Sequence, residues 1–209
     1  MSKSIVILDY GSGNIRSAEK SLAKVGAKVS ISSDYETCLN ADGLVIPGVG
    51  AFESCMQGIK KVKGQEIVDK RLAGSRKVFG ICVGMQIMFE NGLEHGVNTP
   101  GLHQWPGSVT ELKANVLPHM GWNNVEVSKG SQIFNGIESE KFYFVHSYAA
   151  KELDLHGTEK ISAPLKHYSI HGEKFLSSVE NGPLSATQFH PEKSGDAGLQ
   201  LLANWLESV

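Results

Sequence analysis

The first half of the chain alternates between two patterns of apolar residues. Short, continuous apolar runs, which are typical of buried β-strands, occur at residues 5–9, 29–31 and 44–46. Apolar residues at helical spacing occur between and after these runs, in the segments 14–26, 51–59 and 67–72. Strands that alternate with helices in this way predict a parallel sheet whose two faces are covered by helices.

The second half favours strands. After an apolar run at 78–79 and a helix-like run at 85–90, strand-like patterns occur at residues 107–112, 124–127, 142–145, 174–179 and 184–189. A helix over residues 198–206 is predicted to close the chain. We find neither an internal repeat nor a linker. We therefore predict one α/β domain over residues 1–209, with a mostly parallel central sheet flanked by helices and a strand-rich second half.

Composition narrows the class of protein. A chain of 209 residues can bury one substantial core, and a net charge of -2 without a basic stripe argues against nucleic acid as a partner. No apolar run approaches the roughly 20 residues of a membrane-spanning helix, and the first residues do not resemble a signal peptide. Three cysteines without paired spacing indicate a reducing compartment, with Cys38 and Cys55 as packing residues. We expect a cytoplasmic protein.

One cysteine lies where a strand is predicted to turn into a helix. Gly80 and Gly84 flank Cys82 at two residues on either side, and G-x-C-x-G is the pattern of a nucleophile elbow with Cys in the place of Ser. Unpaired N–H groups at the start of a helix favour the thiolate over the thiol. Taken alone, the motif fits a buried apolar cysteine at a tight turn equally well.

A segment near the end of the chain can supply the groups that activate a thiol. His190 and Glu192 are two residues apart after a strand-like run, so their side chains point the same way in an extended chain, and Pro191 stiffens the link. A thiol nucleophile needs a base, and the base needs a third group that orients it. Alone, the segment fits an ordinary surface turn. Together with the elbow it predicts a triad of Cys82, His190 and Glu192.

The segment 47–52 follows another predicted strand and contains two glycines. Acyl chemistry at a thiol creates an oxyanion, and one well-aimed N–H donor contributes about 2.7–4 kcal/mol in the transition state. Val83, which follows the elbow cysteine, offers one such donor, and the sequence Gly48-Val49-Gly50 lets a second backbone N–H approach closely. The glycines also make a flip of the Val49–Gly50 peptide cheap. By itself the segment fits a plain turn at a strand end.

Two further patterns are weaker. Gly11 and Gly13 begin a dinucleotide-binding fingerprint, but Arg16 stands where the third glycine is required. His167 and His171 are four residues apart, yet their surroundings look extended rather than helical, and an added ligand is not in evidence. We therefore expect no cofactor and no metal. Loop or surface positions are expected for the remaining histidines outside the motifs, His95, His103, His119 and His156.

Longer segments carry a resemblance to a known family. They are D-Y-G-S-G-N at 9–14, G-I-C-V-G-M-Q at 80–86, P-H-M-G-W-N at 118–123, F-V-H-S-Y at 144–148 and F-H-P-E-K-S at 189–194. Together they resemble class I (triad) glutamine amidotransferases, and most closely the glutaminase subunits of imidazole glycerol phosphate synthases, which act in histidine biosynthesis. Val83, where the family pattern has leucine, is the one departure near the nucleophile, and it keeps the backbone donor.

The resemblance implies a glutamine amidotransferase type 1 domain over residues 1–209 that hydrolyses L-glutamine to glutamate and ammonia through a cysteinyl thioester. It implies a nucleophile, a general base and acid, and an orienting carboxylate at Cys82, His190 and Glu192. It places the oxyanion hole at Gly50 and Val83. Glutamine would be held by Gln86 and by the backbone around His146, Ser147 and Tyr148. A partner would be met by the loop 118–123 and by Asn14, Trp122, Asn123 and Lys193.

The partner implied by the resemblance is a (β/α)8-barrel cyclase, which forms a heterodimer with the glutaminase and receives its ammonia. In this family the glutaminase is nearly idle until the partner binds its ligand, and segment 48–50 is part of that switch. The chain ends soon after Glu192, so we expect the ammonia acceptor on another polypeptide. Two alternatives stay open: a related glutaminase that feeds a surface-sugar amidination enzyme, and a non-hydrolytic stress protein with a cysteine elbow.

Overall fold

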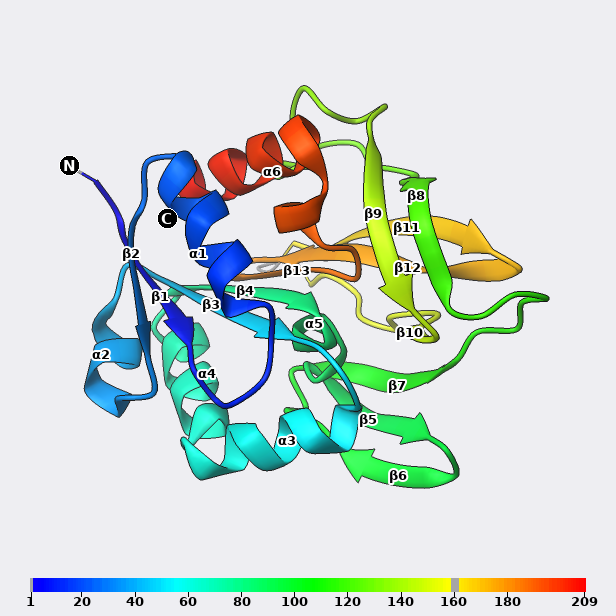
Figure 1. Cartoon of the computed structure of the whole chain (residues 1–209), viewed down its shortest axis with the longest axis horizontal. Helices are drawn as coiled ribbons and strands as arrows, with labels where there is room; N and C mark the ends of the chain where they lie inside the picture. The colour runs from blue at the N-terminus through cyan, green and yellow to red at the C-terminus, as the bar shows by residue number, and fades with distance from the viewer. Residues whose placement is uncertain (1, 159–161) are drawn as a thin grey trace.

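A seven-stranded sheet runs through the centre of the molecule (Figure 1). The computed structural model describes residues 2–158 and 162–209. The strands occur in the order β11 (Leu165–His171), β12 (Glu173–Asn181), β13 (Leu184–Thr187), β4 (Lys77–Cys82), β3 (Gly43–Gly48), β1 (Ser4–Leu8) and β2 (Lys28–Ser32). Neighbours from β13 to β2 pair in parallel, and β12 and β11 are antiparallel. The predicted mostly parallel central sheet is confirmed.

Two smaller sheets account for the strand-rich second half. One has four strands in the order β10 (Tyr148–Ala150), β7 (Trp105–Glu111), β5 (Phe89–Glu94) and β6 (Val97–Pro100). The other pairs β8 (His119–Asn124) with β9 (Lys141–His146). In Figure 1 both lie at the right of the view, beyond the end of the central sheet at which β3 and β4 finish.

Helices cover both faces of the central sheet (Figure 1). On one face lie α1 (Ile15–Lys24) and α6 (Gly195–Ser208), and on the other lie α3 (Phe52–Lys61) and α4 (Gly64–Ala73). The short elements are α2 (Tyr35–Asn40), α5 (Val83–Gln86) and the 3-10 turn η1 (Pro191–Lys193). Across the described residues, every helix is too short or too polar to span a bilayer.

The core forms where apolar strands meet apolar helix faces. All six residues of β3 are buried, as expected for a parallel strand covered on both sides. Trp205 of α6 packs against Phe79 of β4 with ring centroids 5.2 Å apart. Gly43 makes room for it, since a Cβ there would lie 2.9 Å from the indole ring.

Two strand predictions were wrong in part. The run at 29–31 lies in β2, but that strand is half-exposed rather than buried, because β2 is the last strand of the sheet and lacks a neighbour on one side. The predicted strand at 124–127 does not form. Strand β8 ends at Asn124, opposite Lys141, where its partner β9 begins, and beyond this point only Glu126 makes an isolated bridge to Tyr168.

The helix-like run at 85–90 also needs correction. Helix α5 ends at Gln86, and Phe89 already begins β5. The carbonyls that would continue the helix are taken by a distant segment: Leu102 donates to Ile87 (2.7 Å), and Gln104 donates to Met88 (2.9 Å). The β5–β6 hairpin and α2 were not predicted at all.

The segment 118–123 was predicted to be a loop, and His119 was expected at the surface. Both expectations were wrong. The segment forms most of β8, whose residues alternate, so that Met120 and Trp122 face outward while His119 is buried. The other three histidines of that prediction, His95, His103 and His156, are exposed, as expected.

Candidate active site

Parallel pairing brings the separate motifs to one edge of the sheet. Strands β3, β4 and β13 are parallel neighbours, with Gly48 opposite Cys82 and Ile81 opposite Thr187. The carboxyl ends of parallel strands meet at the same edge, where open α/β sheets bind their ligands. His190, which follows β13 by three residues, therefore comes close to a cysteine more than a hundred positions earlier.

The elbow is a tight, strained turn. Cys82 has φ 56° and ψ −113°, a left-handed backbone conformation that L side chains rarely adopt. Its flanking glycines are required by space, because a Cβ at Gly84 would lie 1.8 Å from the Ile46 carbonyl oxygen and a Cβ at Gly80 would lie 2.6 Å from the Gly84 carbonyl oxygen. The turn thus holds the sulfur at the sheet edge at the start of α5.

The cysteine, the histidine and the glutamate form one buried array. His190 Nδ1 lies 2.8 Å from Glu192 Oε1, and each of these two side chains is 2% exposed. On the other side of the ring, the Cys82 thiol, which is 4% exposed, lies near enough to raise the pKa of His190. Cys82 and His190 both line a cavity of about 210 Å³.

The charge state of His190 follows from these contacts. Burial alone opposes its protonation, but hydrogen bonds with Cys82 and Glu192 outweigh burial and raise the pKa of His190 to about 9. Glu192 Oε2 is buried and has no hydrogen-bond partner among the residues that the structure describes. A buried carboxylate in this position is costly unless a neighbouring cation compensates it. The geometry therefore favours imidazolium at His190 beside the sulfur.

Ser194 holds the histidine in place. Its hydroxyl donates to the His190 carbonyl (2.7 Å) and accepts the Tyr143 N–H (3.0 Å). The His190 N–H in turn donates to the Tyr143 carbonyl (2.9 Å). Strand β9 and turn η1 are thereby joined directly beside His190, a role for Ser194 that the sequence motif alone did not reveal.

The segment proposed for the oxyanion hole is held by a hydroxyl. Gly50 has φ 84°, as its glycine allows, and Val49 is 41% exposed. Ser12 donates to the Val49 carbonyl (2.8 Å) and accepts the Val49 N–H (3.4 Å), while the Cys55 thiol also lies 3.5 Å from that carbonyl. Gly50 and Val83 both line the cavity. In this conformation the Val49 N–H is therefore engaged by Ser12.

All four residues predicted to bind glutamine border the same cavity: Gln86, His146, Ser147 and Tyr148. Gln86 donates to the Tyr148 carbonyl (2.8 Å) and to Gln188 Oε1 (3.0 Å), both from its amide nitrogen. Both ring nitrogens of His146 are engaged by protein groups, because Nδ1 meets the Tyr148 carbonyl and Nε2 meets His119.

Two residues of the site were missed by the sequence analysis. Gln188 is 1% exposed and its amide nitrogen lies 3.7 Å from the Cys82 sulfur. The sequence spacing could have identified Gln188. It precedes His190 by two residues, the same spacing from which the contact between His190 and Glu192 was predicted. Glu94 lines the cavity and accepts the N–H of Phe52 at the start of α3 (3.0 Å). Glu94 lies on strand β5, which was not predicted, so the local sequence pattern gave no indication that Glu94 reaches the cavity.

The residues predicted to meet a partner are spread over three elements. Trp122 on β8 is 56% exposed. Asn123 is half-buried, and its amide donates inward to His119 (3.2 Å) and to the Ile170 carbonyl (3.0 Å). Asn14 precedes α1 and is half-buried, and Lys193 is exposed at the rim of the cavity that Cys82 lines.

The histidines His167 and His171, which were considered as a possible metal pair, lie apart from the Cys82 cavity and have separate partners. His167 binds Glu180 (3.1 Å), whereas His171 stacks on His119, so the two do not form a metal pair. Within residues 2–158 and 162–209, no cluster of three His, Cys, Asp or Glu side chains could hold a metal.

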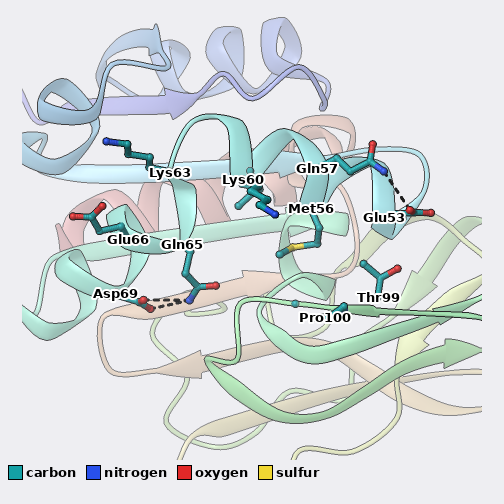
Figure 2. Close-up of a pocket in the computed structure, with 12 residues that line it drawn as sticks. Glu53, Met56, Gln57, Lys60, Lys63, Gln65, Glu66, Asp69, Thr99 and Pro100 are labelled. Carbon is teal, nitrogen blue, oxygen red and sulfur yellow. Dashed lines mark hydrogen bonds between the residues drawn. The ribbon is translucent and has the colours of Figure 1, made fainter.

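A separate cavity of about 660 Å³ lies between α3, α4 and residues 99–101, with Met56 pointing into it and charged residues at its rim (Figure 2).

Comparison with known proteins agrees with this geometry. The family model "Glutamine amidotransferase class-I" matches residues 6–209. The chain is 58% identical over 209 residues to the imidazole glycerol phosphate synthase subunit HisH of Streptomyces avermitilis, covering 99% of this chain and 97% of that one. It is 56% identical over 211 residues to the subunit of the same name from Thermobifida fusca, covering 100% of both.

Solved structures of lower identity share the fold. The crystal structure of a glutamine amidotransferase superposes with a TM-score of 0.72 at 19% identity, covering 98% of this chain and 99% of that one. PurLQS from Thermotoga maritima superposes with a TM-score of 0.70 at 16% identity, covering 100% and 99%. The chain belongs to the class-I glutamine amidotransferases, and within them to the family of imidazole glycerol phosphate synthase HisH subunits.

Proposed function

We propose that this chain is the glutaminase subunit of an imidazole glycerol phosphate synthase of histidine biosynthesis, in which Cys82 attacks L-glutamine and the ammonia passes to a cyclase partner. One observation carries the assignment of the site. In a chain of this family, Cys82, His190 and Glu192 form a single buried array at the wall of a cavity of about 210 Å³.

The first half-reaction forms a thioester. The Cys82 sulfur attacks the side-chain carboxamide carbon of glutamine, and the carbonyl electron pair moves to oxygen. The imidazolium of His190 then gives its proton to the departing nitrogen, the C–N bond breaks, and ammonia leaves. Glu192 orients the ring and stabilises its positive charge, so that the proton is held on the side of the leaving group.

The second half-reaction releases glutamate. Neutral His190 now takes a proton from a water molecule, whose oxygen attacks the thioester carbon. The C–S bond breaks, glutamate leaves with the new C–O bond, and the sulfur and the ring return to the thiolate–imidazolium state. Both half-reactions pass through an oxyanion at the same position.

We place the oxyanion hole at Val83 and Gly50. Val83 is the first residue of α5, so its N–H lacks an intrahelical acceptor and is free to donate to the oxyanion. A second donor requires a change in the Val49–Gly50 peptide, whose carbonyl is held by Ser12 and Cys55. A flip that releases this carbonyl would turn the Gly50 N–H, and Gly50 tolerates the change because it has no side chain.

We assign glutamine binding to Gln86 and to the backbone of residues 146–148. Among the described residues, both hydrogen bonds of the Gln86 side chain leave from its nitrogen, so its carbonyl oxygen remains to accept a hydrogen bond from a ligand. Ser147 and Tyr148 lie where β9 passes into β10, directly at the cavity.

We propose that the partner is a (β/α)8-barrel cyclase that forms a heterodimer with this chain. The surface we assign to it contains Trp122, Asn123, Asn14 and Lys193. Trp122 and Met120 are 56% and 63% exposed on the same face of β8, and exposed aromatic side chains of this kind are frequent anchors of interfaces. All three cysteines are free thiols, which fits a reducing compartment, and we place the enzyme in the cytoplasm.

The decisive experiment uses the complex of this chain with its cyclase. Replacing Cys82→Ala should abolish synthesis that depends on glutamine, and should leave synthesis supported by ammonium salts at the wild-type rate. Cys38→Ala is the matched control, because Cys38 is a buried thiol on α2, away from the cavity. Glutamine hydrolysis that survives in Cys82→Ala would contradict the assignment of the nucleophile.

A further inference from the structure

Two runs of hydrogen bonds meet at the Tyr148 carbonyl, one that comes from β8 and one that leads on to the catalytic sulfur. The direction of each is fixed by groups that can only donate or only accept. The Tyr148 carbonyl can only accept, so Nδ1 of His146 carries the proton that it receives at 3.0 Å. Burial lowers the pKa of His146 to about 3, so the ring is neutral and its Nε2 is an acceptor. His119 Nδ1, at 3.0 Å, is therefore the donor to His146.

The same reasoning extends outward to β8. Burial lowers the pKa of His119 to about 4, so its Nε2 carries no proton and accepts from the amide of Asn123 at 3.2 Å. The second hydrogen of that amide goes to the Ile170 carbonyl, and its oxygen accepts the N–H of Asn124 (2.8 Å). The Asn123 amide can thus adopt only one orientation.

Toward the active site the direction is equally determined. Gln86 uses its amide nitrogen to donate both to the Tyr148 carbonyl (2.8 Å) and to Gln188 Oε1 (3.0 Å). With its oxygen committed to Gln86, Gln188 must direct its nitrogen at the Cys82 sulfur, 3.7 Å away. Gln86, Gln188 and Cys82 are each at most 4% exposed, so these hydrogen bonds are largely shielded from bulk water.

We propose that Gln188 is a further catalytic residue of this enzyme, whose amide N–H stabilises the Cys82 thiolate by a hydrogen bond to the sulfur. Gln86 fixes the orientation of this amide directly and is a positioning residue. His146, His119 and Asn123 are positioning residues at one remove, because they hold the Tyr148 carbonyl that accepts from Gln86. The inference rests on the proposed function, in which Cys82 is the nucleophile. Because a hydrogen bond to an ionised acceptor is roughly twice as strong as one to a neutral acceptor, the donor favours the thiolate over the thiol.

This donor acts together with His190 and does not replace it. The ring of His190 supplies the positive charge and the proton, whereas Gln188 supplies a neutral donor that cannot transfer a proton. The titratable groups that surround the sulfur are His190, Lys193, Glu94, His146 and Tyr148 at the cavity, and Tyr10 and Cys55 behind residues 49–50. The variants proposed below leave all of these unchanged.

The test measures how fast iodoacetamide alkylates Cys82 in the full-length chain as a function of pH, with the Cys82 peptide quantified by mass spectrometry. Gln188→Met keeps an unbranched side chain of similar length and removes the donor. We expect the pH at which alkylation is half-maximal to rise by about one unit, so that alkylation slows by up to about tenfold at pH values well below the wild-type midpoint. Gln188→Glu keeps the acceptor for Gln86 and places a carboxylate beside the sulfur, so its shift should be at least as large.

A second pair of variants tests the positioning residues. His119→Phe keeps a ring that stacks on Phe144 and His171, but breaks the chain on both sides. We expect its alkylation at pH 7 to be several-fold slower, because Gln188 is less firmly oriented. His171→Phe is the control, since His171 stacks on the same ring at 4.2 Å but lies outside the chain, and it should leave alkylation unchanged.

Each outcome decides a stated point. A folded Gln188→Met or Gln188→Glu protein whose alkylation profile matches the wild type would overturn the role of Gln188. If Gln188→Met fails to fold, Gln188→Glu decides. If a Gln188 variant shows the shifted alkylation profile but His119→Phe is alkylated like the wild type, the role of Gln188 stands and the positioning role of His119 is overturned. Failure of the proposed function is separate, because it appears as glutamine hydrolysis by Cys82→Ala, whatever the alkylation profiles show.

Discussion

Two sets of buried histidines near the cavity that Cys82 lines differ in charge: His190 is an imidazolium, whereas His146 and His119 are neutral. His190 is 2% exposed, His146 6% and His119 5%, so burial is nearly the same for all three. Yet the pKa of His190 is raised to about 9, whereas those of His146 and His119 are lowered to about 3 and 4. The partner of the ring makes the difference. His190 faces a buried carboxylate and a thiol, whereas His146 faces a carbonyl and another neutral ring.

The comparison shows that burial sets the cost of a charge but does not decide where a charge resides. The imidazolium of His190 is also one of the charges that lower the pKa of His146. The neutral pair therefore supplies directional hydrogen bonds close to the catalytic cation without adding a second positive charge. Four predictions test this division between the two sets.

The largest effect is expected on removal of the charged histidine. His190→Asn deletes the proton carrier and should lower glutamine hydrolysis by the complex at least about 10⁴-fold, because the thiol then has neither a base nor a cation. The measurement is glutamate release in the complex, with synthesis from ammonium salts as the control for an intact cyclase. A loss below about tenfold would show that His190 is not the base.

Removal of the carboxylate should make His190 resemble the neutral pair. Glu192→Gln keeps the shape of the side chain but cannot compensate an imidazolium, so glutamine hydrolysis should fall about 10³-fold and the pKa of His190 should drop well below its present value of about 9. NMR titration of the imidazole carbon signals measures the pKa. An unchanged pKa in this variant would show that the carboxylate is not what holds the charge.

The neutral pair should make the protein sensitive to acid. The folded-state pKa values of His119 and His146 lie below the ordinary value of 6.5, so the unfolded chain binds more protons below pH 6.5 and stability falls on acidification. Between pH 7 and pH 5 each histidine should lower the free energy of unfolding by about 2 kcal/mol. Urea unfolding of His119→Phe should show a loss smaller by about that amount. An identical pH dependence in wild type and variant would contradict the neutral state of His119.

The smallest effect is expected when a carboxylate is placed beside the neutral His119, which should raise the pKa of this histidine. Asn123→Asp places a carboxylate at His119 Nε2, where the amide nitrogen now lies 3.2 Å away. The pKa of His119 should rise by about one to two units from its present value of about 4. Asn124→Asp, on the outward face of the same strand, is the matched control and should leave that pKa unchanged. A shift of equal size in both variants would mean that distance to a charge, rather than the specific contact, sets the pKa.

Much of this site follows from local sequence. The G-x-C-x-G spacing specifies a turn in which both glycines are needed for space, and the short link between His190 and Glu192 leaves them in contact. The β-α alternation of the first half is likewise readable, because strand and helix periodicities are properties of neighbouring residues. The predictions that failed depended on contacts with distant segments, such as the edge position of β2, the point where β9 begins opposite β8, and a captured hydrogen bond at the end of α5. Helix α5 stops because residues 102–105 capture the carbonyls of residues 87 and 88.

By itself, then, the sequence determined the class of fold, the elbow and the identity of the groups that can do the chemistry. The tertiary structure decided which donor meets which acceptor. Gln86 reaches Tyr148 across 62 residues, and Gln188 reaches Cys82 across 106. Contacts of this kind depend on strand order and register in the assembled sheets, which local periodicity does not encode. The inward turn of His119, its neutral ring and the direction of the Gln188 amide all have this origin.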